Sequence, residues 1–298
     1  MGIASFEVAG GSVRGTRHRH GDVNAQDALY WETRGGLSAL AVTDGCSSGR
    51  HSEVGAKLGA RFLAEAFFME CAGGEPAGAA SWGSDPSAFL ERVHRRLFGL
   101  FLGVVGGMGG RSRETLLDWL LFAAVAAFRT PEHTLVACFG DGVAALNGEV
   151  RVVEAEDNRP RYPMYGVMGD PEPVIACPGE PLWDVPTAEV ETLLLGTDGV
   201  ADLIAAEART LPGTGERVGG LAQFWSEDRY FRNPDAVRRR LARINRDHQR
   251  IEWEARRLHR ENGLLPDDTT LLVLRRAAAE AAPGARPEQE GEPWPKRT

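Results

Sequence analysis

Apolar and polar positions alternate along this chain in short runs, and polar turns separate the runs. Short apolar runs bounded by Gly, Pro, Asn or Asp are typical of β-strands. Between residues 116 and 153 such runs follow one another, broken only by Thr-Pro-Glu-His, Gly-Asp-Gly and Asn-Gly, which predicts consecutive antiparallel hairpins. The expected strands cover residues 3–8, 28–32, 37–42, 120–128, 134–139, 143–147, 150–153, 190–195 and 269–275.

Three other segments show the 3.6-residue apolar period of an amphipathic helix. The first covers residues 52–71. The second begins at Asp85, a capping residue followed by Pro, and ends in the glycine-rich residues 103–110, which lack the Gly-Lys-Ser/Thr of a phosphate-binding loop. The third covers residues 233–261. Its many arginines alternate with acids, which favours an ion-paired, solvated face over a nucleic-acid surface.

Composition and charge narrow the class of protein. The 298 residues are 43% hydrophobic, so we expect one domain at residues 1–276, followed by a disordered tail at residues 277–298. A formal net charge of −8 argues against non-specific binding to nucleic acid or to an acidic membrane. The four cysteines form no Cys-x-x-Cys pair, and no apolar run reaches the roughly 18 residues of a spanning helix. We therefore expect a cytoplasmic monomer.

Carboxylates stand at the ends of several expected strands. Asp44, Asp141 and Asp198 each follow an apolar run and precede a glycine, and Asp267 and Asp268 precede the last strand. Because the end of one antiparallel strand lies beside the start of its neighbour, these acids could gather at one rim of the core. Asp-Gly is also the commonest hairpin turn signal. This alternative applies most to Asp141, which lies between two short strands.

A cluster of carboxylates has a specific chemical implication. Such groups repel one another unless protons or cations neutralise them, and an all-oxygen site favours hard cations such as Mg²⁺ or Mn²⁺. A carboxylate that bridges two such ions about 3.5–4 Å apart creates a nucleophilic water and offsets the charge of a phosphoryl group. The glycine after each Asp would let a backbone carbonyl approach an ion. Phosphate hydrolysis is the reaction that suits this site.

A polar segment at residues 14–27 precedes the first acidic strand end. Its arginines and histidines stand beside Asn24, Gln26 and Asp27. The segment could bind an anion, or it could be a solvated surface loop.

Five motifs stand in a fixed order: Gln26-Asp27-Ala28, Val42-Thr43-Asp44-Gly45, Gly140-Asp141-Gly142, Leu195-Gly196-Thr197-Asp198-Gly199 and Asp267-Asp268-Thr269-Thr270. In this order and spacing they resemble the protein phosphatase 2C family of metal-dependent (PPM) Ser/Thr phosphatases, in particular a bacterial branch. The resemblance covers roughly residues 5–275. It implies an α+β fold, a four-layer α-β-β-α sandwich in which helices flank two central antiparallel sheets.

The resemblance also implies a role for each acid. Asp44 would bridge two Mg²⁺ or Mn²⁺ ions, and the Gly45 carbonyl would bind one of them. Asp198 and Asp267 would complete the shell of the first ion. Asp141 would share a weaker third metal site with Asp198.

Other positions concern the substrate and the attacking water. Asp27, catalytic together with Asp44, would orient a metal-bound water. Members of the family usually carry a phosphate-binding Arg where this chain has Asp22. His18, as a further catalytic group, or Arg17 or Arg19 could substitute for it. Two more departures are Gln26 in place of a Glu and Asp268 in place of an Asn.

These expectations define a function and an alternative. The function is hydrolysis of phosphoserine or phosphothreonine in a phosphorylated protein, by direct attack of a water bridging two Mg²⁺ or Mn²⁺ ions. Because the usual Arg is missing, a catalytically weak phosphatase-like module that engages a partner such as a Ser/Thr kinase is the second interpretation. A structural protein whose Asp-Gly pairs are only turns is the third.

Overall fold

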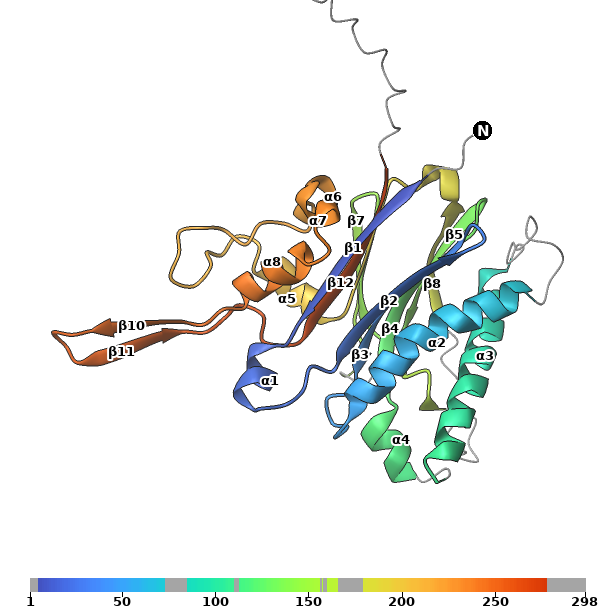
Figure 1. The fold of residues 1–298 in the computed structure, drawn as a ribbon, viewed down its shortest axis with the longest axis horizontal. Coiled ribbons are helices and arrows are strands. Elements are labelled where there is room, and N and C mark those ends of the chain that lie inside the picture. Colours follow the sequence, from blue (N-terminus) through green and yellow to red (C-terminus); the bar gives the residue numbers. More distant parts are fainter. Residues whose placement is uncertain are drawn as a thin grey trace, which may run out of the picture.

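Two antiparallel sheets lie face to face at the centre of the molecule, and helices cover their outer faces (Figure 1). The structure is a computed structural model, and it describes residues 5–72, 85–109, 113–155, 157, 160–165 and 179–277. The expected α+β, four-layer α-β-β-α sandwich is confirmed. Apart from Ala277, the expected C-terminal tail lies outside the described residues.

The first sheet has the strand order β2-β3-β4-β5-β8. Its strands are β2 (Asp27–Arg34), β3 (Leu37–Gly45), β4 (Phe122–Arg129), β5 (His133–Phe139) and β8 (Glu180–Pro186). On its outer face lie α2 (Ser52–Ala72), α3 (Pro86–Gly107) and α4 (Arg113–Trp119). The predicted helix start at Asp85 is confirmed, because the Asp85 side chain accepts a hydrogen bond from the Ala88 amide at 2.9 Å.

The second sheet has the strand order β1-β12-β9-β6-β7. Its strands are β1 (Phe6–Val13), β12 (Thr269–Arg276), β9 (Thr192–Gly196), β6 (Gly142–Leu146) and β7 (Glu149–Val153). The helices on its side are α5 (Gly199–Ala205), α6 (Gln223–Ser226), α7 (Arg229–Arg232) and α8 (Ala236–Ile244). Two further short elements are α1 (Thr16–His20), which follows β1, and η3 (Thr187–Glu189), which follows β8.

Three apolar layers hold the sandwich together. One lies between the sheets and includes Leu40, Val125 and Leu272. A second lies between the first sheet and α2 and α3, and a third between the second sheet and α5–α8. Every residue of β4 is buried, because this strand lies in the middle of its sheet and both of its faces are covered. The same packing explains why its sequence is apolar without alternation.

The predicted run of consecutive hairpins is wrong at one point. β4 pairs with β5, and β6 pairs with β7, but β5 and β6 belong to different sheets. The chain crosses from one sheet to the other at Gly140-Asp141-Gly142, where both glycines have positive φ, 107° and 145°. Asp141-Gly142 is therefore a crossover between layers and not a hairpin turn.

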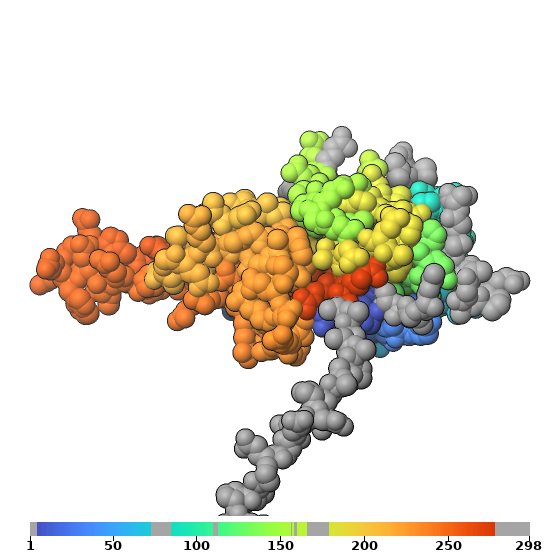
Figure 2. All heavy atoms as spheres, turned by 90° about the horizontal axis from the view of Figure 1, so that it is seen from above, coloured from blue at the N-terminus to red at the C-terminus, as the bar shows by residue number. Residues whose placement is uncertain are grey.

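The predicted helix at residues 233–261 is also wrong beyond Ile244. There α8 ends, because the fully buried Asn245 side chain donates to the Arg14 carbonyl at 2.8 Å and accepts from the Leu265 amide at 3.1 Å. The chain continues as a hairpin of β10 (His248–Glu252) and β11 (Arg257–Glu261) that projects from one end of the molecule (Figure 2). Ile251 and Leu258, which suggested a helical stripe, are opposite each other across this hairpin and exposed.

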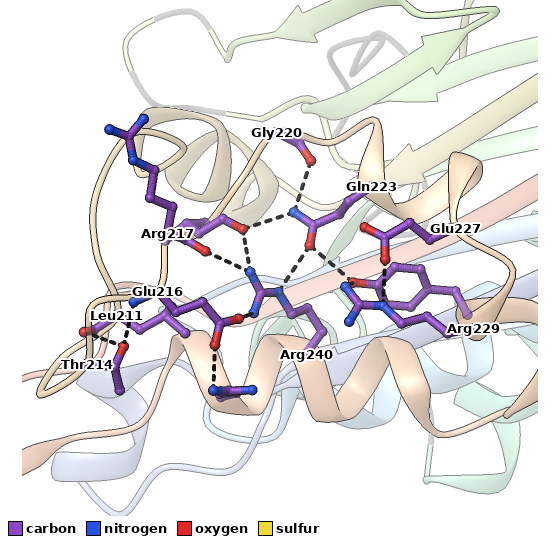
Figure 3. Close-up of polar contacts among 12 residues, drawn as sticks. Leu211, Thr214, Glu216, Arg217, Gly220, Gln223, Glu227, Arg229 and Arg240 are labelled. Carbon is purple, nitrogen blue, oxygen red and sulfur yellow. Dashed lines mark hydrogen bonds and ion pairs between the residues drawn. The ribbon is translucent and has the colours of Figure 1, made fainter.

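The arginines of α8 are ion-paired, as the sequence predicted. Arg240 and Arg243 both pair with Glu216, and Arg240 also donates to Gln223 Oε1 at 3.1 Å and to the Val218 carbonyl at 2.7 Å (Figure 3). These bonds fasten the loop between α5 and α6 to α8. The arginine charges on this face of α8 are therefore neutralised by acids of the same chain.

Part of the polar, proline-rich stretch at residues 154–189 enters the core, although its sequence shows little apolar periodicity and predicts a surface segment. Tyr162 and Met164 are buried against the outer face of the first sheet. The buried His94 ring of α3 is 2.8 Å from the Pro163 carbonyl, and β8 forms an edge of the first sheet. Among the described residues, no helix is long and apolar enough to cross a bilayer.

Candidate functional site

The acids predicted at strand ends gather at one rim of the sandwich. β2 and β12 begin at this rim, and β3, β5 and β9 end there. Antiparallel pairing places Asp27 at the start of β2 directly opposite Asp44 near the end of β3. Asp198 follows β9 and Asp267 precedes β12, so both sheets contribute. This acidic rim consists of Asp27, Asp44, Asp141, Asp198 and Asp267.

Asp27 and Asp44 form the deepest part of the acidic rim. Asp27 is buried and accepts a hydrogen bond from the Thr197 hydroxyl at 2.8 Å. Burial, and then the charge of Asp268, raise the pKa of Asp27 to about 8. Burial, and then the charges of Asp27 and Asp198, raise the pKa of Asp44 well above its usual range. Each of the two carboxyl groups is among the groups that shift the pKa of the other, as is expected for carboxylates on directly opposed residues.

The remaining acids lie around this pair. Burial is the main cause that raises the pKa of Asp198 to about 6, and the charges of Asp267 and Asp141 contribute less. Burial raises the pKa of Asp141 as well. Asp202 joins them from α5: burial and the Asp267 charge raise its pKa, and Arg17 opposes this rise. Mutual repulsion of this kind is what a bound cation relieves.

Close packing explains the glycine after three of these acids. A Cβ on Gly45 would lie 2.8 Å from the Ser52 carbonyl oxygen. A Cβ on Gly199 would lie 2.0 Å from the Asp268 carbonyl oxygen, and one on Gly142 would lie 2.5 Å from Val125 Cγ2. Each glycine therefore lets the backbone at an Asp come close to a neighbouring segment.

The acidic rim fits a hard cation by its donor atoms. Its side chains offer only oxygen, the preference of Mg²⁺ and Mn²⁺. Asp27 Oδ1, Asp141 Oδ1 and the neighbouring Gln26 Oε1 are buried acceptors without a hydrogen-bond partner in the described part of the chain. Within that same part, no three His, Cys, Asp or Glu side chains already form a metal-binding group. The acids thus lie at one rim without converging on a single point.

The Asp268 carboxylate bonds to backbone amides, and it is not one of the five acids of the acidic rim. Its Oδ1 accepts from the Gly15 amide at 2.6 Å, and its Oδ2 accepts from the Gln26 amide at 2.5 Å. His18 Nδ1 lies 3.0 Å from Oδ2. This buried carboxylate therefore binds both ends of the polar segment 14–27 to the start of β12, and this pair of bonds forms the Asp268 clamp. His18, expected among the catalytic groups, faces this clamp.

Arg17 and Arg19, the two arginines expected at the phosphate, have different surroundings. Arg19 donates to the Asn245 carbonyl and to Asp247 Oδ1, both at 2.7 Å, so its guanidinium is tied to the segment after α8. Arg17 is exposed, and its charge acts on Asp202. Of the two, Arg17 has the position beside the rim. Asp22, where the family carries Arg, is exposed and has a positive φ of 54°.

Sequence reasoning missed two residues near the rim. Asp202 lies four positions after Asp198, a spacing that places both on one side of the short helix α5 and could have revealed it. Tyr162 lies near Cys46 and Asp44: burial raises its pKa, and the neighbouring Cys46 thiol and Asp44 charge add to this rise. Nothing in the sequence around Tyr162 indicates this position.

Comparison with two solved structures, a bacterial serine phosphatase and Stp1, supports the fold. A bacterial serine phosphatase superposes with a TM-score of 0.53 at 11% identity, covering 93% of this chain and 100% of the other. The serine/threonine phosphatase Stp1 from Staphylococcus aureus gives 0.52 at 11% identity, covering 93% and 98%. The catalytic domain of serine threonine protein phosphatase PstP, in complex with 2 manganese ions, gives 0.48 at 16% identity, covering 91% and 97%.

Comparison at the sequence level identifies the family. A search of curated proteins finds no match. The family description "Protein phosphatase 2C" matches residues 14–244, a stretch that includes Asp27, Asp44, Asp141 and Asp198. The expected resemblance is thereby confirmed, and the chain belongs to the protein phosphatase 2C family.

Proposed function

We propose that this protein is a metal-dependent phosphatase that hydrolyses phosphoserine or phosphothreonine in proteins. The observation that carries the proposal is the gathering of Asp27, Asp44, Asp198 and Asp267 from both sheets at one rim, where burial and mutual repulsion raise the pKa values of the first three. Family membership supports the same reaction. When bound, two Mg²⁺ or Mn²⁺ ions would lower the pKa of water and offset the charge of the phosphoryl group.

Each acid of the rim has a proposed task. Asp44 would lie between the two ions, and the Gly45 carbonyl would face one of them. Asp198 and Asp267, which lie across the rim on the second sheet, would hold the first ion. Asp141 would contribute with Asp198 to a third, weaker site. This assignment uses the groups whose charges repel one another.

Asp27 would orient the attacking water. Its Oδ2 is fixed by the Thr197 hydroxyl, whereas Oδ1 is buried without a partner in the described part of the chain. That free acceptor is suited to hold a proton of a water molecule. Because the pKa of Asp27 is raised to about 8, close to a working pH near neutrality, this carboxyl group is suited to accept such a proton when it is ionised and to release it again.

Arg17 would bind the substrate phosphate in place of the family's usual Arg. A guanidinium is the side chain best suited to a phosphate. Arg17 is exposed beside the rim, whereas Arg19 is occupied by Asp247. With this substitute present, the interpretation as a kinase-binding module without turnover is not proposed.

Phosphate release from a phosphothreonine peptide tests the proposal. We expect turnover with Mn²⁺ or Mg²⁺, none in chelator, and a loss of at least about 100-fold in Asp198→Asn. Glu227→Gln, which changes a partly exposed acid that follows α6 and pairs with Arg229, serves as the matched control and should retain activity. Full activity of Asp198→Asn would contradict the proposal.

A further inference from the structure

A row of polar side chains closes the layer between the two sheets at the end opposite the acidic rim. Thr33, Ser38, Arg129 and Thr134 are consecutive register partners across β2, β3, β4 and β5. The preceding inward-facing row is Trp31, Leu40, Ala127 and Val136. Side chains alternate between faces along a strand, so the polar row also faces the second sheet. Ser38 and Asp44 are six positions apart on β3, which separates the row from the rim by about 20 Å.

Arg129 is a buried cation without a carboxylate partner in the described part of the chain. Only 8% of its surface is exposed. Its Nη2 donates to Ser38 Oγ at 2.8 Å, and its Nε is buried with no hydrogen-bond partner among the described residues. The guanidinium also lies 4.9 Å from the Phe6 ring. Such a cation–π contact offsets only part of the free-energy cost of burying an ion.

The neighbouring groups leave a surplus of hydrogen-bond donors. Thr33 Oγ1 and Ser38 Oγ are 3.0 Å apart, and this contact uses one of their two hydroxyl hydrogens. Since Ser38 already accepts from Arg129, the buried Arg129 Nε needs an acceptor, and the second hydroxyl hydrogen of the pair, whose Thr33 member is exposed, remains available to donate to water or to a ligand. Glu32 does not supply this acceptor, because its carboxylate oxygens accept from Arg34 and Tyr30 at 2.7–3.0 Å.

A cavity of about 250 Å³ lies beside this donor cluster, lined by Arg129, Ser38 and Thr33 and by the apolar Phe6, Val8 and Leu274. It is smaller than the about 300–1,000 Å³ of sites for drug-sized ligands. At about 30 Å³ for each water volume, it would hold roughly eight to ten non-hydrogen atoms. One side of the cavity offers charge and donors, and the other offers apolar surface.

We propose that this cavity binds a small monocarboxylate with a compact apolar body. The Arg129 guanidinium and the spare hydroxyl of the Thr33–Ser38 pair hold the carboxylate, and Phe6, Val8 and Leu274 contact the apolar body. A carboxylate supplies the acceptors that the cluster lacks and neutralises the buried charge. The site lies between the sheets and does not depend on the proposed phosphatase activity.

Benzoate is a suitable probe, and chelator keeps metal ions away from the acidic rim during the measurement. We expect benzoate to raise the melting temperature of the full chain with increasing concentration. Calorimetry should show binding at least about tenfold weaker in Arg129→Met. Arg232→Met, which removes an exposed arginine of α7, is the matched control and should bind as the unmodified chain does. No response of the unmodified chain, or equal binding by Arg129→Met, overturns the proposal.

Two further ligands test the contribution of the charge and that of the apolar body separately. Benzamide has the shape of benzoate without its charge, and we expect binding at least about tenfold weaker. Inorganic phosphate has charge without an apolar body, and we expect it to bind more weakly than benzoate. Benzamide binding as tight as that of benzoate would overturn the role of the charge, and tighter binding of phosphate would overturn the role of the apolar body.

Changes in the amide chemical shifts of the unmodified chain during a benzoate titration locate the ligand. This measurement does not depend on whether Arg129→Met folds. We expect the largest shifts at Thr33, Ser38 and Arg129, and severalfold weaker binding in Thr33→Val. Shifts confined to the acidic rim would overturn the proposal.

Discussion

Asp27 and Asp44 are directly opposed partners on β2 and β3 at the acidic rim, and burial raises the pKa of both carboxyl groups. With these raised pKa values, the pair keeps protons at a higher pH than ordinary carboxyl groups do. A cation that binds beside Asp44 has to displace them. Metal binding, proton binding and stability are therefore linked at this pair.

The first prediction follows from the pKa of Asp27. This pKa is about 8 in the folded chain and 3.8 for an ordinary Asp, so between these pH values the folded state binds more protons than the unfolded state. The free energy of unfolding in chelator should therefore fall as the pH rises from about 4 to about 8. Urea unfolding at several pH values measures this decline.

Asp27→Asn is the control for this pH dependence, because it removes the titrating group. The decline should be shallower in this variant, and an equally steep decline would contradict the assignment. In the unmodified chain, Mn²⁺ should raise the melting temperature more at pH 8 than at pH 5, because fewer protons remain to be displaced.

The second prediction concerns the Asp268 clamp. In Asp268→Asn only one side-chain oxygen remains for the Gly15 and Gln26 amides, which now bond to Oδ1 and Oδ2 respectively. Leaving a buried amide without its acceptor should cost about 1–3 kcal/mol of unfolding free energy. Asp267→Asn, next to it but half-buried and facing the rim, should change stability much less in the same urea experiment. Equal effects of the two substitutions would argue against the clamp.

The third prediction compares two glycines. In Gly199→Ala the new Cβ would lie 2.0 Å from the Asp268 carbonyl oxygen, so the backbone has to move. We expect a loss of about 2 kcal/mol or more. Gly103→Ala, on an exposed turn of α3 with nothing within 4 Å, should instead stabilise the chain by about 0.5–1 kcal/mol. Calorimetric unfolding of both variants checks this contrast, which would fail if they changed stability in the same direction.

The fourth prediction separates the two candidate phosphate-binding arginines. Arg17→Gln should raise the KM for a phosphopeptide by about tenfold without lowering stability, because Arg17 is exposed beside the rim. Arg19→Gln should chiefly lower stability, since Arg19 bonds to Asn245 and Asp247. Steady-state kinetics and urea unfolding measure the two effects. An unchanged KM in Arg17→Gln would remove Arg17 from the proposed site.

Much of the fold was predictable because buried helices and strands leave a local pattern of apolar positions in the sequence. The helix α2 and the strands β3 and β12 lie where apolar period and strand length placed them. The acidic rim followed from antiparallel order, since strand ends marked by Asp-Gly must meet the starts of their neighbours. The order and spacing of the five motifs were enough to indicate the family.

The errors have one physical origin, which is that long-range contacts override local pattern. Ile251 and Leu258 fit a helical period, but the buried Asn245 ends α8 by bonding to Arg14 and Leu265, which are distant in sequence. Asp268 carried the motif of a site residue, yet its oxygens bond to the backbone of another loop. The Arg129 row was invisible for the same reason, because strand register alone brings Thr33, Ser38 and Thr134 beside it.

The central claim is that the acidic rim holds the metal ions of a phosphatase. A crystal structure of the protein soaked in Mn²⁺, with anomalous diffraction to locate manganese, tests it most directly. We predict anomalous peaks between Asp44, Asp198 and Asp267, with oxygen ligands. Their absence from the rim in crystals of protein that hydrolyses a phosphopeptide with Mn²⁺ would contradict the account.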